Sequence, residues 1–251
     1  MTSDSDASPP AIARSNHGRY GFLTPATEPA STWVVGVGVG AVAVVVIFGL
    51  LVARITAFTV GEMHLSAVLN AWHTGGIGAI ASGVYAVFSP APAIVITILV
   101  AAAILLRSRD LRLAITFGIV IAATWIPSAL VKALVARPRP DAAMLPHPFA
   151  VQPSDASYPS GHMVFVTALV VTLILLTRGH RLRPLVTVLG MALVALVGIS
   201  LVIDGVHFTS DALASILWSI GVAPFALEAW NRYVLPRSYR GDRAARPSSL
   251  G

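Results

Sequence analysis

The residues best suited to chemistry lie in three short polar clusters between positions 132 and 211, each beside a long apolar run. The clusters read Lys132-Ala-Leu-Val-Ala-Arg-Pro-Arg-Pro140, Tyr158-Pro-Ser-Gly-His162 and Asp204-Gly-Val-His-Phe-Thr-Ser-Asp211. Lys132 is the single lysine in a chain with sixteen arginines. Cations, imidazoles and a carboxylate gathered at the ends of apolar segments indicate a reaction site.

His207 and Asp211 in the third cluster are spaced to work as a pair. A separation of four residues at the start of a helix places both on one face, so the Asp211 carboxylate can accept the imidazole N–H of His207. That hydrogen bond fixes the tautomer and leaves the other ring nitrogen free as a nucleophile or a base. Taken alone, the same spacing also fits a His–Asp pair that caps a helix.

The second cluster begins a helix after Pro159. Free backbone N–H groups at a helix start favour an anion, and Gly161 lets a phosphate approach the backbone. Ser160 can cap the helix or donate to a phosphate oxygen, and His162 in the first turn can donate a proton. The alternative is an ordinary serine cap followed by an interfacial histidine.

Lys132 and Arg139 place two cations beside this anion site, with Arg137 as a third candidate. Arginine binds phosphate oxygens in a bidentate manner, whereas lysine acts as a point charge. The alternative is that these side chains snorkel from the end of an apolar helix. An unpaired carboxylate at the end of a membrane span is costly, so we expect Asp204 to pair with Arg137 or Arg139.

The composition is that of an integral membrane protein. The 251 residues are 56% hydrophobic and 11% charged, with a mean hydropathy of +0.79. The net charge of +6 and pI near 10.5 would suit nucleic acid. However, the basic residues lie in short loops and the C-terminal tail, which fits membrane topology and anionic lipid headgroups instead. Without cysteine, thiolate catalysis and cysteine metal sites are excluded.

The apolar runs predict an all-α bundle of six transmembrane helices, since about 20 residues cross a hydrocarbon core and the 33-residue run can cross once if tilted or kinked. The expected spans are 33–53, 74–106, 113–131, 160–177, 184–203 and 209–230. Residues 59–73 carry polar side chains at helical spacing and predict a short interfacial helix. The predicted organisation is a disordered cytoplasmic tail at 1–32, a membrane domain at 33–231 and a basic cytoplasmic tail at 232–251.

The arginines predict the orientation of this bundle. Six spans place both termini and two basic turns on one side, which then holds 13 of the 17 basic residues. By the positive-inside rule that side is cytoplasmic, so the three polar clusters face the outer side of the plasma membrane.

Together the clusters resemble the three signature motifs of the type-2 phosphatidic acid phosphatase superfamily, in order and in separation. The resemblance extends over nearly everything after Trp33 and implies metal-independent hydrolysis of a membrane lipid phosphate. His207 would attack phosphorus to form a phosphohistidine that Asp211 orients, and His162 would protonate the leaving oxygen and then activate water. The phosphoryl oxygens would be held by Lys132, Arg139, Ser160 and Gly161. No cofactor or metal is expected, since cations and amides supply the charge stabilisation.

One position departs from the family pattern. The arginine of the third motif is replaced by Leu201, so Arg137 and Asp204 become candidate auxiliary residues. We expect a retained but retuned phosphatase acting on a polyprenyl pyrophosphate, phosphatidylglycerol phosphate or phosphatidate. The alternatives are a lipid phosphotransferase and a catalytically weakened lipid-phosphate binder. A Ser160–His207–Asp211 acyl-transfer triad and a transporter are less favoured, and the oligomeric state is not predicted.

Overall fold

The computed structural model describes residues 32–150 and 153–234, so the two predicted tails lie almost entirely outside it. These residues fold into helices and connecting loops, without a strand among them, as the all-α prediction requires. The elements are α1 (Thr32–Val52), α2 (Thr56–Asn70), α3 (Gly75–Val87), α4 (Pro90–Ser108), α5 (Leu111–Trp125), α6 (Ser128–Val135), η3 (Ala142–Met144), α7 (Gly161–Leu176), α8 (Arg183–Ile203), α9 (Thr209–Ala229) and η4 (Trp230–Val234).

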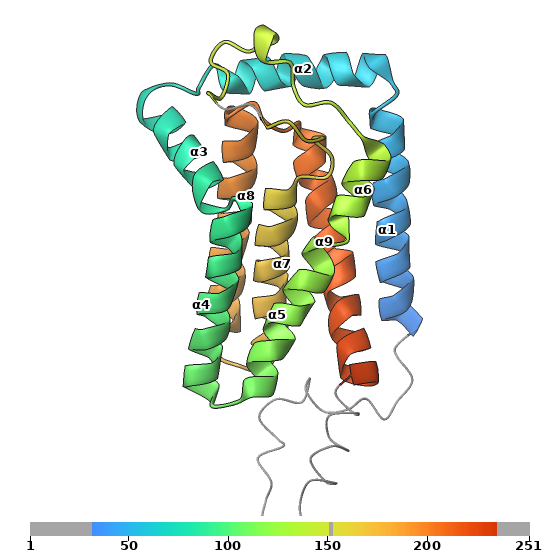
Figure 1. The fold of residues 1–251 in the computed structure, drawn as a ribbon, viewed down its shortest axis with the longest axis vertical. Helices are drawn as coiled ribbons and strands as arrows, with labels where there is room; N and C mark the ends of the chain where they lie inside the picture. Colours follow the sequence, from blue (N-terminus) through green and yellow to red (C-terminus); the bar gives the residue numbers. More distant parts are fainter. Residues whose placement is uncertain (1–31, 151–152, 235–251) are drawn as a thin grey trace, which may run out of the picture.

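The bundle is built around α7, which packs against α5, α8 and α9 (Figure 1). Outside this centre, α1 packs along α9, α4 along α5 and α3 against α8. The side chains of α7 explain its place, because most of its residues from Met163 to Thr172 are buried. By contrast, the only buried residue of the peripheral helix α4 is Ala93.

Five segments of the described residues are long and apolar enough to cross a membrane. They are Thr32–Val52, Pro90–Ser108, Leu111–Val135, Arg183–Ile203 and Thr209–Val234. The remaining predicted span, at 160–177, corresponds to α7, whose 16 residues extend about 24 Å at 1.5 Å per residue. This is shorter than a hydrocarbon core of about 30 Å. Five segments of the described residues could therefore cross a membrane, while a count of six remains a prediction.

Two of the predicted spans are interrupted at prolines. The predicted 74–106 span divides at Ser89, whose carbonyl still accepts from Ala93 while Pro90 begins α4. The predicted 113–131 span divides at Pro127 between α5 and α6, and the Ser128 hydroxyl bonds the Trp125 carbonyl there at 2.6 Å. Proline lacks the amide that a continuous helix needs, so the axis changes direction at each break.

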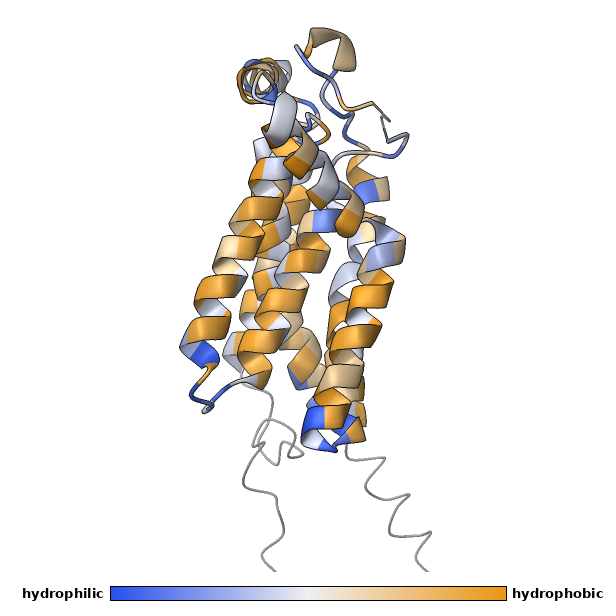
Figure 2. Cartoon of the chain, turned by 90° about the vertical axis from the view of Figure 1, so that its left-hand side faces the viewer, coloured by the Kyte–Doolittle hydropathy of each residue, from blue (hydrophilic) through white to orange (hydrophobic). Residues whose placement is uncertain are grey.

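The helix α2 lies across one end of the bundle, as the interfacial prediction for residues 59–73 requires (Figure 1). Its buried residues Met63, Ser66 and Asn70 follow helical spacing and face the bundle. Figure 2 shows apolar residues along the length of the bundle helices and polar residues at their ends. Large exposed side chains such as Ile98 and Leu99 on α4 fit contact with lipid rather than water.

Candidate active site

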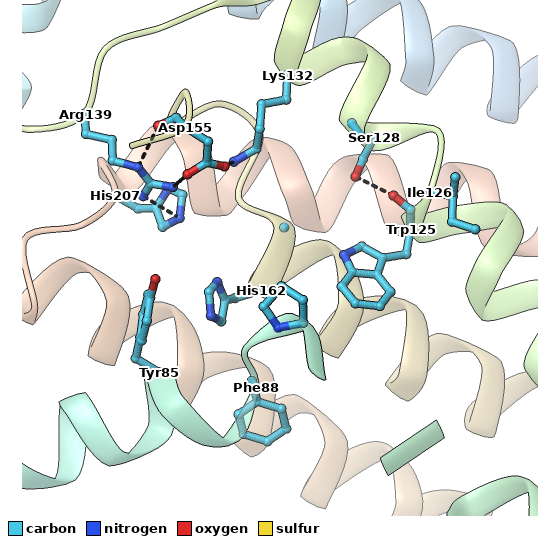
Figure 3. Close-up of a pocket in the computed structure, with 13 residues that line it drawn as sticks. Tyr85, Phe88, Trp125, Ile126, Ser128, Lys132, Arg139, Asp155, His162 and His207 are labelled. Atoms are coloured by element: carbon cyan, nitrogen blue, oxygen red, sulfur yellow. Dashed lines mark hydrogen bonds and ion pairs between the residues drawn. The ribbon is translucent and has the colours of Figure 1, made fainter. Parts of the chain in front are cut away.

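The three polar clusters meet at the end of the bundle that α2 covers. A cavity of about 520 Å³ lies there between α3, α5, α6 and the start of α7 (Figure 3). Its charged and polar lining residues are Lys132, Arg139, Asp155, His162 and His207. Its aromatic and aliphatic lining residues are Tyr85, Phe88, Pro90, Trp125, Ile126 and Ala129, with Ser128 and Gly161 completing the wall. The cavity therefore has a charged part and an apolar part.

Lys132 and Arg139 converge on one side of the cavity through Asp155 (Figure 3). The Lys132 ammonium donates to the Asp155 carboxylate at 2.7 Å and to the Ala156 carbonyl at 2.7 Å. Arg139 donates to the other oxygen of that carboxylate at 2.6 Å and to the Asp155 carbonyl at 2.9 Å. A single carboxylate thus bridges the two cations that the sequence predicts for a phosphate.

His207 presents one ring nitrogen to this cation pair. Its Nε2 lies 3.2 Å from Nη1 of Arg139, which also donates to the Val206 carbonyl at 2.6 Å. Because a guanidinium can only donate, Nε2 must carry the lone pair and Nδ1 the proton. Nδ1 lies 3.5 Å from Oδ2 of Asp211, so the predicted His–Asp pair is in contact but too long here for a hydrogen bond. The Nε2 lone pair is therefore directed at Arg139, and both residues line the cavity.

Burial keeps the His207 ring neutral. Burial and the neighbouring Arg139 lower the pKa of His207 to about 4, against the opposing effect of Asp211. A neutral imidazole is the form that can attack an electrophile. At neutral pH the side chain is thus in its nucleophilic state before any substrate binds.

His162 reaches the cavity from the first turn of α7. Its ring lies against Tyr85 with centroids 4.4 Å apart, and its Nε2 is buried without a hydrogen-bond partner among the described residues. Gly161 beside it lines the cavity, so the helix start faces the same space. The structure therefore brings His162 to the same cavity as His207, and its proton-transfer role stays a prediction.

Ser160 caps the start of α7 and is not among the residues that line the cavity. Its hydroxyl accepts from the Met163 amide at 3.4 Å, and the residue is fully buried outside the cavity lining. Of the two sequence alternatives, capping the helix is thus the one the geometry displays. The acyl-transfer triad has no support, since the Ser160 hydroxyl does not face His207 across the cavity.

Arg137 lies behind the site rather than in it. Its guanidinium is 1% exposed and donates to Asp211 at 2.7 Å, to Ser210 at 2.7 Å and to Glu62 at 2.6 Å. It also lies over the Phe208 ring, 4.1 Å from the centroid. Arg137 is therefore not among the residues that line the cavity.

The expected pairing of Asp204 with Arg137 or Arg139 is wrong. Asp204 ends α8 on the side of the loop that faces α2 and α3, where it lies 3.2 Å from His73 Nε2 and accepts from Ser82 at 3.2 Å. Both arginines are taken by other carboxylates. Burial raises the pKa of Asp204 to about 6, partly offset by His73 and Ser82.

Two carboxylates and a set of aromatic residues near the site were not predicted from the sequence. Asp155 stood in a polar loop, where nothing marked it from other loop acids. Glu62 appeared only as a polar residue of an interfacial helix, and its partner Arg137 is 75 positions away. The aromatic residues of the cavity were also missed. Phe88 and Trp125 lie beside the helix breaks at Pro90 and Pro127, and Tyr85 lies in the last turn of α3, so these two prolines were the available signal.

The comparisons with known proteins agree with this arrangement. The sequence model of the PAP2 superfamily matches residues 112–234. The fold also resembles the crystal structure of a transmembrane PAP2 type phosphatidylglycerolphosphate phosphatase from Bacillus subtilis. That likeness has a TM-score of 0.64 at 18% identity and covers 84% of this chain and 98% of the other. Among curated protein sequences none matches this chain.

The fold is therefore that of a helical membrane protein of the PAP2 type. Residues 112–234, which carry all three motifs, match the sequence model of the PAP2 superfamily.

Proposed function

We propose that this protein is a membrane lipid phosphate phosphatase that works through a phosphohistidine on His207. The observation that carries the proposal is the contact between Arg139 and the Nε2 lone pair of His207 inside the two-cation site. A phosphoryl group bound by Lys132 and Arg139 would place phosphorus next to that nitrogen. Bound cations also stabilise the negative charge that spreads over the phosphoryl oxygens during transfer.

The proposed reaction has two steps. Binding of the anionic phosphate favours the protonated form of His162. The Nε2 lone pair of His207 attacks phosphorus, the phosphorus–oxygen bond to the lipid breaks, and the His162 imidazolium gives its proton to the leaving oxygen. His162 then takes a proton from water, which attacks the phosphohistidine and releases inorganic phosphate. The backbone amides at the start of α7, next to Gly161, add hydrogen bonds to the phosphoryl oxygens.

The shape of the cavity supports an amphiphilic substrate. Charged groups lie on one side, and Phe88, Trp125 and Ile126 lie on the other, at the breaks between α3 and α4 and between α5 and α6. Helix ends that open at the bundle surface would let an apolar tail stay in lipid while the headgroup binds. The candidate substrates are polyprenyl pyrophosphate, phosphatidylglycerol phosphate and phosphatidate.

The orientation of the site is part of the proposal. All three clusters lie at the α2 end, whereas the arginine-rich turns after α4 and α7 lie at the opposite end of those helices. By the positive-inside rule, this supports an active site on the extracytoplasmic side of the plasma membrane. A reporter fused after Arg246 should then be cytoplasmic, and an extracytoplasmic signal would contradict this topology.

Phosphate release from a panel of lipid phosphates tests the function. The purified protein should release phosphate from at least one of the three classes, with equal rates in the presence of a chelator. The variant His207→Ala should release none and should lose the labelled phosphohistidine that the wild type forms. Absence of release from every lipid by a folded wild-type protein would overturn the proposal.

Two other outcomes have specific support. Leu201 is fully buried in the apolar cluster with Met163 and Phe165, so the third-motif arginine has no counterpart at that position. This favours a weakened enzyme or a lipid-phosphate binder as the second candidate, which would bind lipid phosphate without turnover. A phosphotransferase would use the same phosphohistidine, and transfer to an added lipid alcohol would identify it.

A further inference from the structure

A buried chain of charged side chains connects α2 to His207. Its first member, Glu62, belongs to none of the three motifs. Glu62 on α2 accepts from Arg137 at 2.6 Å, and Arg137 in turn donates to Asp211 at 2.7 Å. Asp211 faces Nδ1 of His207 at 3.5 Å. The side chain of Glu62 is 12% exposed and that of Arg137 is 1% exposed, so water screens these charges little.

Glu62 also fixes the start of α9, the helix that carries Asp211. Its Oε1 accepts from the Ser210 amide at 2.9 Å, and its Oε2 accepts from the Ser210 hydroxyl at 2.7 Å. The amide at this position has no partner within the helix. A carboxylate from another helix therefore supplies the cap, with a charge that the helix dipole favours.

A second residue of α2 holds the other end of the same loop. Asn70, two helical turns after Glu62, donates to the Ile203 carbonyl at the end of α8 at 2.8 Å. His207 lies between these two attachment points, in the loop that joins α8 to α9. The loop is thus held at both ends by one helix that lies across the bundle (Figure 1).

We propose that Glu62 is a positioning residue for the reaction of His207. The Glu62 carboxylate offsets the positive charge of Arg137, so that Arg137 cancels less of the attraction between Asp211 and the Nδ1 proton. It also holds the start of α9 in place relative to the cavity. The inference rests on the proposed phosphatase function. Glu62 itself does not touch the cavity and takes no part in phosphate binding.

The test compares Glu62→Gln with the wild type in detergent micelles. Removing the charge should lower kcat by roughly ten- to hundredfold, because small displacements of a reacting group have effects of this size. KM and the inhibition constant of inorganic phosphate should change less than twofold, since Lys132 and Arg139 keep their contacts. The variant Glu62→Asp should recover part of kcat.

The acid limb of the pH profile of kcat/KM separates positioning from a general structural effect. Loss of a nearby negative charge disfavours the imidazolium form, so the limb should move to lower pH in Glu62→Gln. The substrate is the same for both proteins, so its own ionisation cancels in the comparison. The charged and titratable groups that face His207 are Asp211 on α9, Lys132 on α6, His162 on α7, and Arg139 and Asp155 on the loops.

Matched controls complete the test. Glu228→Gln removes a carboxylate near the far end of α9 and should leave kcat and the pH limb unchanged. If Glu62→Gln does not fold, as judged by gel filtration and melting, Ser210→Ala replaces it. That variant keeps every charge, loses two hydroxyl contacts and should lower kcat several-fold at unchanged KM.

Wild-type kcat with an unshifted acid limb in Glu62→Gln, or wild-type kcat in Ser210→Ala, would overturn the inference. Parallel loss of phosphate affinity and kcat would overturn it as well, because the cation site would then be affected. Failure of the phosphatase proposal is separate, since it would show as no phosphate release by the wild type in the same assay.

Discussion

The carboxylate of Asp155 forms ion pairs with Lys132 and Arg139, the two cations that would bind a substrate phosphate. Replacing Asp155 with asparagine should therefore strengthen phosphate binding. The carboxylate lies 2.7 Å from the Lys132 ammonium and 2.6 Å from the Arg139 guanidinium. Hydrogen bonds from these cations outweigh the effect of burial and lower the pKa of Asp155 to about 2. The competing charge is therefore present at every pH at which the enzyme would be assayed.

The size of the effect follows from the exposure of the pair. The Asp155 side chain is 55% exposed while Lys132 and Arg139 are 19% and 10% exposed, so each ion pair contributes about 0.5 kcal/mol, near the middle of the range for pairs in contact with water. Two pairs together give about 1 kcal/mol, or roughly a fivefold change in an equilibrium constant. The carbonyl contacts from Asp155 and Ala156 would remain in Asp155→Asn and keep both cations in place.

The inhibition constant of inorganic phosphate measures this competition at fixed ionic strength. It should fall about fivefold in Asp155→Asn. Asp141→Asn is the control, since Asp141 caps η3 in the same loop and should leave the constant unchanged. A higher inhibition constant in Asp155→Asn would refute the reasoning, because the carboxylate would then be needed to hold the cations rather than compete for them.

Three further predictions concern other parts of the molecule. His162→Gln should slow phosphate release from alkyl phosphates by about a hundredfold or more. It should keep the first-turnover burst with p-nitrophenyl phosphate, because that leaving group needs no proton. An equal loss of the burst would contradict the acid role of His162. Gly49→Val should lower the melting temperature, because a Cβ there meets the Tyr158 ring, whereas Gly36→Val has open space and serves as the control. The pKa of Asp204 is raised by burial from 3.8 to about 6, so ionisation costs stability as pH rises through this range. Asp204→Asn should therefore raise the melting temperature at pH 8 and lose this advantage below about pH 4, and an equal gain at both pH values would contradict the assignment.

The sequence allowed the helices and the meeting of Lys132, Arg139, His162 and His207 at one cavity to be predicted, because both follow from local features. Apolar runs of span length and the cap at Ser160 each act within a short stretch of the chain, whereas the break at Pro127 within the predicted 113–131 span was not predicted. The contacts between elements were not predictable in this way. Asp204 was assigned to an arginine because only charge and position along the chain were considered, yet the fold places His73 beside it.

The same limit explains Arg137. Its position in the first cluster suggests a phosphate ligand, but the fold presents it with two carboxylates from α2 and α9. A buried guanidinium requires such partners. The periodicity of the sequence does not give the distance between Glu62 and Arg137. The contacts that link Glu62 and Arg137 to Asp211 beside His207 could therefore be found only in the structure.

The contacts of α2 also decide what could be moved between proteins. Residues 112–234 contain every motif and match the superfamily on their own, but Glu62 and Asn70 lie outside that segment. A chimera that carried only the matched segment would import the reacting groups without the helix that holds their loop at both ends. Exchange of this segment between relatives should therefore succeed only when the α2 of the same parent is transferred with it.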